Sequence, residues 1–190
     1  MASDPFDSRI QLCRATRIIS SGGVIAYPTE AVFGLGCDPD SREGVQRILD
    51  MKQRSVSAGL ILIASDREQL HRWIAPLPEE QRCLDAVSPT AITWIVTAHP
   101  RTPYWVSGGR STVAVRITRH PVAAALCRYS QTALISTSAN RHGRAPARSR
   151  LAVRKQLGAG VDYIVPGTLG TDAGPTEIRV ARTGDVLRPA

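Results

Sequence analysis

The chain has 190 residues, 43% of them hydrophobic and 21% charged, which is the composition of an ordinary globular protein with a sizeable core. No apolar run approaches the roughly 20 residues of a membrane helix, and the N-terminus lacks the basic and apolar regions of a secretory signal, so we expect a cytoplasmic protein that contacts no membrane. The net charge of +8 favours polyanions such as nucleotides or RNA as partners, but a basic domain without a nucleic-acid role has the same composition.

The first predicted helix covers residues 8–21, where apolar residues recur on one helical face and two glycines follow. The stretch VIAYPTEAVFGLGCD at 24–38 then opens with a short buried strand that stops at Pro28, which has no amide donor. The polar pair Thr29 and Glu30 and two glycines would follow in a loop. A strand that ends in this way commonly builds a binding site, but the same residues suit a tight turn with positive-φ glycines equally well.

Helices and strands alternate through the rest of the chain, which predicts an α/β sheet protein. The expected helices cover residues 41–51, 66–74, 79–87, 121–129 and a segment ending at 158. The expected strands cover residues 60–64, 91–98, 112–117, 133–137 and 161–165, with two more near the C-terminus, and 99–111 is expected to be a loop. All linkers are short, so we expect one domain over residues 1–190.

The cysteines and histidines form no recognisable site. The four of each type are scattered, without the spacing of a zinc ribbon, a dithiol or a metal-binding histidine pair. We therefore expect neither a disulfide framework nor a metal centre built from them.

Two cations, Lys52 and Arg54, stand two residues apart after a predicted helix. In an extended segment both could hold neighbouring phosphates, the lysine as a point charge and the arginine as a planar fork. Cations are also favoured at any helix C-terminus, by about 0.3–1 kcal/mol, and taken alone this second interpretation is the stronger.

Polar residues also follow the predicted strand at 133–137, in the sequence S-T-S-A-N. Such a strand end can donate several hydrogen bonds to a phosphate, although an ordinary turn or helix cap uses the same residues. In the strand at 112–117, Arg116 shares a face with Thr112, so it lies either at an edge exposed to water or on the floor of a pocket.

The common signatures G-x-x-x-x-G-K-[ST], G-x-G-x-x-G, H-E-x-x-H and G-x-S-x-G are absent. The motifs that are present, in chain order, are P-T-E-A-V-F-G-L-G-C-D, K-Q-R, G-L-I-L-I-A, T-V-A-V-R, S-T-S-A-N and L-R-P. Each is weak alone, but in this order over about residues 18–189 the chain resembles the YrdC family, and its length is similar to the short, TsaC-type branch. The resemblance implies a twisted mixed sheet with flanking helices and a basic concave cleft.

The resemblance implies a nucleotidyltransferase that makes threonylcarbamoyl-AMP. L-Threonine and bicarbonate (or CO2) would combine to N-carboxy-threonine, and ATP would adenylate this carboxylate and release pyrophosphate. The product would serve threonylcarbamoyl-adenosine modification of tRNAs that read codons beginning with A, with TsaB-, TsaD- and TsaE-type proteins acting downstream. Mg2+ would accompany ATP. Glu30 is a candidate metal ligand, but a structural hydrogen bond is the more ordinary role for it, and direct binding of tRNA is left open.

The resemblance also implies roles for ten residues. Lys52 and Arg54 would hold the ATP phosphates and stabilise the departing pyrophosphate, and they are the two catalytic candidates. Arg116 would pair with the threonine carboxylate, and Thr29 and Thr176 would also contact threonine. The other ATP contacts would come from Thr112, Ser136, Ser138, Asn140 and Arg188.

The chain departs from the family pattern in three places. Residues 87–90 read V-S-P-T where many members have W-P-G-P, and Ala58 and Ile63 stand where the longer branch has Asn and His. A different function is also open: the charge and the arginines of 141–154 suit a non-catalytic module that binds double-stranded RNA or tRNA. A third possibility, the carbamoyl-phosphate module of hydrogenase maturation proteins, belongs to much larger chains.

Overall fold

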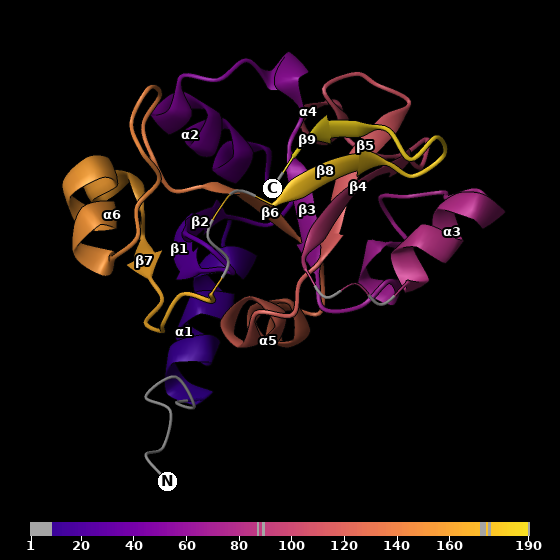
Figure 1. Ribbon diagram of the computed structural model, residues 1–190. Coiled ribbons are helices and arrows are strands. Elements are labelled where there is room, and N and C mark those ends of the chain that lie inside the picture. Colours follow the sequence, from indigo (N-terminus) through magenta and orange to yellow (C-terminus); the bar gives the residue numbers. More distant parts are fainter. Residues whose placement is uncertain (1–8, 87, 89, 172–173, 175, 190) are drawn as a thin grey trace, which may run out of the picture.

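The computed structural model describes residues 9–86, 88, 90–171, 174 and 176–189, and its centre is a nine-stranded mixed sheet (Figure 1). The strand order is β7-β1-β2-β6-β3-β5-β4-β8-β9. The strands are β1 (Ile25–Pro28), β2 (Phe33–Gly36), β3 (Ile61–Ala64), β4 (Ile92–Thr97), β5 (Thr112–Ile117), β6 (Leu134–Ser138), β7 (Tyr163–Ile164), β8 (Glu177–Val180) and β9 (Val186–Arg188). The predicted α/β class with a mixed sheet and flanking helices is confirmed.

Six α-helices and three short 3-10 helices are described around this sheet. The α-helices are α1 (Arg9–Ser20), α2 (Arg42–Lys52), α3 (Pro78–Asp85), α4 (Tyr104–Ser107), α5 (Pro121–Ser130) and α6 (Arg150–Leu157). The 3-10 helices are η1 (Val56–Ala58), η2 (Glu68–Leu70) and η3 (Gly158–Gly160). None of the helices in the described part of the chain could span a bilayer.

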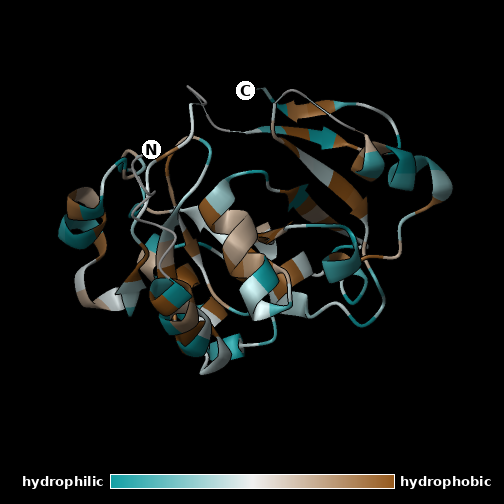
Figure 2. Cartoon of the chain, turned by 90° about the horizontal axis from the view of Figure 1, so that it is seen from below, coloured by the Kyte–Doolittle hydropathy of each residue, from teal (hydrophilic) through white to brown (hydrophobic). Residues whose placement is uncertain are grey.

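One face of the sheet is covered by α1 and α5, which lie beneath it in Figure 1. Ile19 of α1 and Leu126 of α5 are fully buried in one cluster with Ile25 and Leu134 of the sheet. The helices that flank the sheet carry both hydrophobic and hydrophilic residues (Figure 2), as helices with one buried side do.

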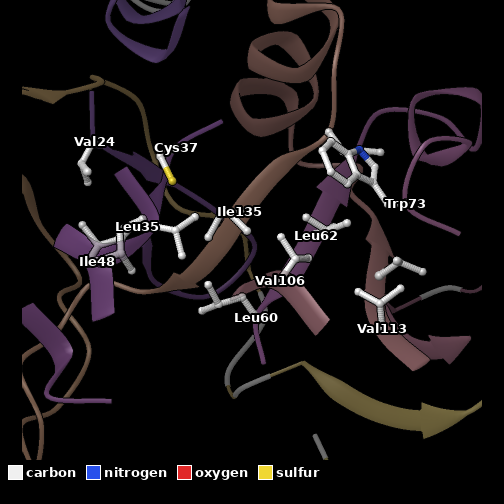
Figure 3. Packing of buried hydrophobic residues seen from close by; sticks show 14 of the residues in the cluster. Val24, Leu35, Cys37, Ile48, Leu60, Leu62, Trp73, Val106, Val113 and Ile135 are labelled. Atoms are coloured by element: carbon white, nitrogen blue, oxygen red, sulfur yellow. The ribbon is translucent and has the colours of Figure 1, made fainter. Parts of the chain in front are cut away.

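The opposite face carries the larger part of the core, under α2. Ile48 of α2 packs in one cluster with Leu35, Leu62 and Ile135, which come from the central strands β2, β3 and β6 (Figure 3). Strand residues alternate between the two faces, so neighbouring positions of β6 supply the two clusters.

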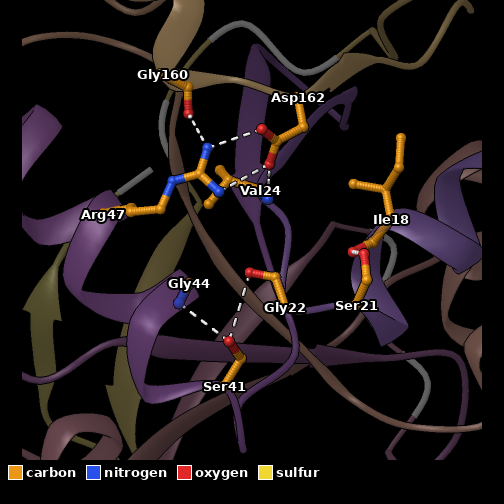
Figure 4. Close-up of polar contacts among 9 residues, drawn as sticks. All are labelled: Ile18, Ser21, Gly22, Val24, Ser41, Gly44, Arg47, Gly160 and Asp162. Carbon is orange, nitrogen blue, oxygen red and sulfur yellow. Dashed lines mark hydrogen bonds and ion pairs between the residues drawn. The ribbon is translucent and has the colours of Figure 1, made fainter.

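An ion pair joins α2 to the residues just before β1 and β7 (Figure 4). Arg47 of α2 donates to both carboxylate oxygens of Asp162 at 2.9 Å and to the carbonyl of Gly160 at 3.2 Å. Asp162 also accepts the backbone N–H of Val24 at 2.7 Å. These bonds fix the position of α2, whose last residue is Lys52.

The two glycines expected in a loop lie in β2, so that prediction is wrong. Gly34 and Gly36 pair antiparallel with β1, and neither is among the positive-φ glycines. A Cβ on Gly36 would lie 2.6 Å from the carbonyl oxygen of Ile135 and 2.8 Å from the Tyr27 ring. The glycines are therefore needed for close packing inside the sheet rather than for a turn.

The helix expected at 66–74 is also wrong, because only η2 forms there. The N–H of Gln69 donates to Asp66 Oδ1 at 3.1 Å, as in a cap. The chain then pairs with the end of β4 instead: Ile74 bridges Ala98, and His99 N–H donates to the carbonyl of Trp73 at 2.9 Å. Tertiary pairing overrides the local helical pattern.

The remaining boundaries differ by a few residues from those expected. The helix expected at 79–87 begins at Pro78 and ends at Asp85, and the loop at 99–111 contains the short α4. Ser8, Val87 and Pro89 lie outside the described residues, so the first residue of the first helix and the V-S-P-T turn are not compared.

Candidate functional site

A cleft of about 1200 Å³ lies over the central strands and is lined by segments from distant parts of the chain. Strand pairing brings several of these segments together, since Gly34 of β2 pairs with Ser138 of β6, and Ile63 of β3 pairs with Arg116 of β5. All ten residues singled out in the sequence line this one cleft: Thr29, Lys52, Arg54, Thr112, Arg116, Ser136, Ser138, Asn140, Thr176 and Arg188.

Positive charge dominates the lining. Its cationic residues are Lys52, Arg54, Arg110, Arg116, Arg148 and Arg188, and the described residues of the lining include no aspartate or glutamate. Arg110 was not singled out in the sequence, and Arg148 was considered only among the arginines of 141–154 that suit an RNA-binding module. The signals available for them were a G-G-R turn before a strand and a place in a basic loop, and neither is specific.

Lys52 is the last residue of α2 and points at the loop after β6. Its Nζ donates to the carbonyl of Ser138 at 2.7 Å, the carbonyl of Asn140 at 3.2 Å and Asn140 Oδ1 at 2.9 Å. Burial, and secondly the charge of Arg54, lower the pKa of Lys52 to about 8. Gln53 follows in the left-handed region with φ 47°, so the segment is not extended, yet Lys52 and Arg54 both line the cleft.

Arg116 is buried on β5 at the floor of the cleft. The sequence had left open whether it lies at an edge exposed to water or on a pocket floor, and the second position is the one observed. Its Nη1 donates to Thr176 Oγ1 at 2.5 Å, and its Nε is buried without a partner among the described residues. Arg188 also contacts Thr176, because its Nη2 donates to the Thr176 carbonyl at 2.5 Å. Thr29 donates its hydroxyl to the carbonyl of Val32 at 2.7 Å, so its oxygen remains an acceptor toward the cleft.

Glu30 lies behind Arg116 and is not part of the cleft lining. It accepts the Thr118 hydroxyl at 2.6 Å, and its Oε2 lies 4.0 Å from Arg116 Nη2. Burial raises the pKa of Glu30, but the charge of Arg116 and the Thr118 hydrogen bond outweigh this, so its pKa lies below the usual value. The ionised carboxylate therefore faces Arg116 at ion-pair distance without a hydrogen bond between them. In the described part of the chain no cluster of His, Cys, Asp or Glu residues is suited to a metal ion.

Residues 17–190 match the model of the Sua5/YciO/YrdC family, described as telomere recombination. A threonylcarbamoyl-AMP synthase of Nitrosococcus oceani is 53% identical over 175 residues, which cover 92% of this chain and 95% of that protein. A protein with the same name from Alkalilimnicola ehrlichii is 50% identical over 183 residues, covering 95% of each chain.

Solved structures have the same fold. P. abyssi Sua5 in complex with L-threonine superposes with a TM-score of 0.84 at 27% identity, over 94% of this chain and 53% of that one, so the present chain spans about half of the Sua5 chain. E. coli YciO superposes with a TM-score of 0.80 over 95% of this chain and 88% of that one, and at 24% identity it supports the fold alone. Family model, relatives and fold agree, and this chain belongs to the Sua5/YciO/YrdC family.

Proposed function

We propose that this protein is an L-threonylcarbamoyladenylate synthase, a nucleotidyltransferase that makes threonylcarbamoyl-AMP and pyrophosphate from L-threonine, bicarbonate or CO2, and ATP. The observation that carries the proposal is one cleft that gathers cations, hydroxyls and an amide from five separate segments. The names of relatives at about 50% identity over nearly the whole chain support it. The whole chain, residues 1–190, acts as one domain.

Threonine binds at the floor of the cleft, with its carboxylate on Arg116. The buried, unpartnered Nε of Arg116 is a donor that a carboxylate oxygen satisfies, which removes the cost of an unpaired buried group. Thr176, which contacts this guanidinium, and Thr29, which lines the same cleft, form hydrogen bonds with the polar groups of threonine.

ATP binds with its phosphates at Lys52 and Arg54. The other contacts to the nucleotide come from Thr112, Ser136, Ser138, Asn140 and Arg188. The threonine nitrogen, as the free amine, forms a bond to the carbon of CO2 and releases a proton to solvent, or forms it to the carbon of bicarbonate with loss of water. An oxygen of the resulting carbamate then attacks the α-phosphorus of ATP. As the bond from this phosphorus to the leaving oxygen breaks, its electron pair stays on pyrophosphate. The cations stabilise that growing charge, and no covalent enzyme intermediate is needed.

The described residues of the cleft lining offer no carboxylate site for the Mg2+ that accompanies ATP. Magnesium sites usually combine phosphates with one or two carboxylates, and the described lining of the cleft contains no carboxylate. In this proposal the phosphates of ATP therefore bind the ion and bring it into the cleft. Downstream, the product passes to TsaB-, TsaD- and TsaE-type proteins in the cytoplasm, and the arginines of the 141–154 segment are the surface on which tRNA would bind.

The deciding experiment incubates the purified protein with L-threonine, bicarbonate, ATP and Mg2+. We expect pyrophosphate and an AMP adduct that both depend on threonine. A protein that makes no threonine-dependent adduct, yet binds tRNA in a salt-sensitive way, would instead be the RNA-binding module.

A further inference from the structure

Two arginines converge on one short turn at the edge of the cleft. Arg54 Nη2 donates to the carbonyl of Gly59 at 2.9 Å and lies 3.5 Å from the carbonyl oxygen of Ala58. Arg110 Nη1 donates to the same Ala58 carbonyl at 3.1 Å, and its Nη2 donates to the carbonyl of Ser57 at 2.6 Å. Because both side chains reach one carbonyl oxygen, their guanidinium groups are neighbours.

The backbone is built to bring Arg110 to this place. Gly108 and the next glycine have φ values of 67° and 80°, which side-chain-bearing residues rarely adopt. A Cβ on Gly108 would lie 2.6 Å from the carbonyl oxygen of Ser57. The turn is also held by the Leu60 N–H, which donates to the carbonyl of Val106 at 2.9 Å. Figure 3 shows both side chains among the buried core residues. Arg110 is therefore held against η1 by a rigid turn.

This pair of cations lacks a counter-ion within the described residues, where no carboxylate lies within 4.0 Å of either guanidinium. Burial, and secondly the charge of Arg110, lower the pKa of Arg54, as expected when two like charges face each other. Capping the carbonyls of a 3-10 turn requires hydrogen-bond donors but not two full charges. An anion bound between them would remove the repulsion, and each guanidinium keeps N–H donors for it.

We propose that Arg110, together with Arg54, binds the terminal phosphates of ATP and then the departing pyrophosphate. This inference rests on the proposed function, which places the phosphates at Arg54. When the bond from the α-phosphorus to the leaving oxygen breaks, its electron pair and charge pass to pyrophosphate, which the two guanidiniums hold by charge-assisted hydrogen bonds. Arg110 then contributes to both nucleotide affinity and the rate of adenylation.

The test compares Arg110→Gln, which keeps amide donors for the turn but removes the charge, with Arg110→Lys, which keeps the charge. Arg128→Gln, on the exposed side of α5, is the matched control. Inorganic pyrophosphate binding is measured by calorimetry at fixed ionic strength. We expect it to weaken about tenfold in Arg110→Gln, less in Arg110→Lys and not in the control. Threonine affinity should stay unchanged, and kcat should fall together with ATP affinity.

The proposal is overturned if Arg110→Gln binds pyrophosphate as tightly as the unaltered protein and changes only its melting temperature. That result would leave Arg110 as a cap of η1. If the unaltered protein binds pyrophosphate in an Arg110-dependent way but makes no threonine-dependent adduct, the anion site stands and the proposed function fails. The two ideas are thus separated by the same set of samples.

Discussion

Lys52 carries its ammonium group to the point where the last turn of α2 meets the end of β6. Its hydrogen bonds to Ser138 and Asn140 fix the loop that the proposed function assigns to the nucleotide. Burial, with a smaller contribution from Arg54, leaves the pKa of this lysine at about 8, so near neutral pH a small part of the protein has lost the charge. A phosphate beside Nζ favours the protonated form and raises the pKa again.

The affinity for ATP should therefore fall as the pH rises above 8. The free protein loses the Lys52 proton there, while the complex keeps it, so binding must take up a proton. Kd should rise by about tenfold per pH unit at most between the two pKa values. Calorimetric titration from pH 7 to 9.5 measures this slope.

Two controls separate Lys52 from other groups. Lys52→Arg keeps a charge at every pH of the titration, so its Kd should lose the pH dependence. The chain has only two lysines, Lys52 and Lys155, so NMR of 13Cε-lysine gives two resonances that arginine replacements assign directly. A Lys52 resonance that titrates near pH 10.5 would refute the lowered pKa.

The sequence was informative about residues whose position follows from local periodicity. Alternation along 112–117 limited Arg116 to an edge or a pocket floor, and the structure has it at the floor. The partners of Lys52 could not be predicted in this way, because they lie 86 and 88 positions away in the chain. Only the order of the motifs, matched to a family, placed Lys52 and Ser138 in one site.

Among the elements, β2 is packed so tightly that a single added Cβ atom at Gly36 would clash. It lies between β1 and β6, and its Gly36 approaches the Ile135 carbonyl and the Tyr27 ring so closely that no side chain fits. Gly34, two positions earlier on the same strand, is less constrained, since its Cβ would meet a Thr29 methyl group at 3.2 Å. The two glycines therefore form a natural pair for comparison.

Gly36→Ala should destabilise the protein by about 1–3 kcal/mol, the usual cost of overpacking against atoms that cannot move freely. Gly34→Ala should cost clearly less, because a methyl group on a side chain can shift. Urea unfolding followed by circular dichroism measures both free energies. If the two variants lose the same free energy of unfolding, the close approach of Gly36 to the Ile135 carbonyl does not affect stability.

Elements were predictable where local signals and tertiary packing agree. The start of α2 follows from Ser41, whose side chain accepts the Gly44 N–H at 3.0 Å as a cap, and its buried side follows from helical periodicity. The segment at 66–74 has the same kinds of signal, but its pairing with the end of β4 limits the helix to one 3-10 turn. Such pairing involves residues distant in sequence, so it cannot be recognised from the local sequence pattern.

At the scale of the whole molecule, the cleft is lined by segments from both halves of the chain. Residues of 29–34, 52–61, 106–116, 136–148 and 174–188 all line it. A ligand bound there contacts parts of the chain that separate on unfolding, so binding adds to the free energy of unfolding. ATP and threonine occupy different parts of this cleft in the proposed function, and each should stabilise the fold on its own.

We expect each ligand at 100 times its Kd to add about 2.7 kcal/mol, which for this chain length raises the melting temperature by roughly 5–10 °C. In Arg116→Gln the increment from threonine should disappear, because the carboxylate loses its guanidinium, while the increment from ATP should remain. The readout is the ligand-induced shift and not the melting temperature itself, since leaving Glu30 without Arg116 lowers stability before any ligand is added. Arg128→Gln on α5 should keep both shifts. If Arg116→Gln keeps the full threonine shift, threonine binds elsewhere, and the division of the cleft between its two substrates is wrong.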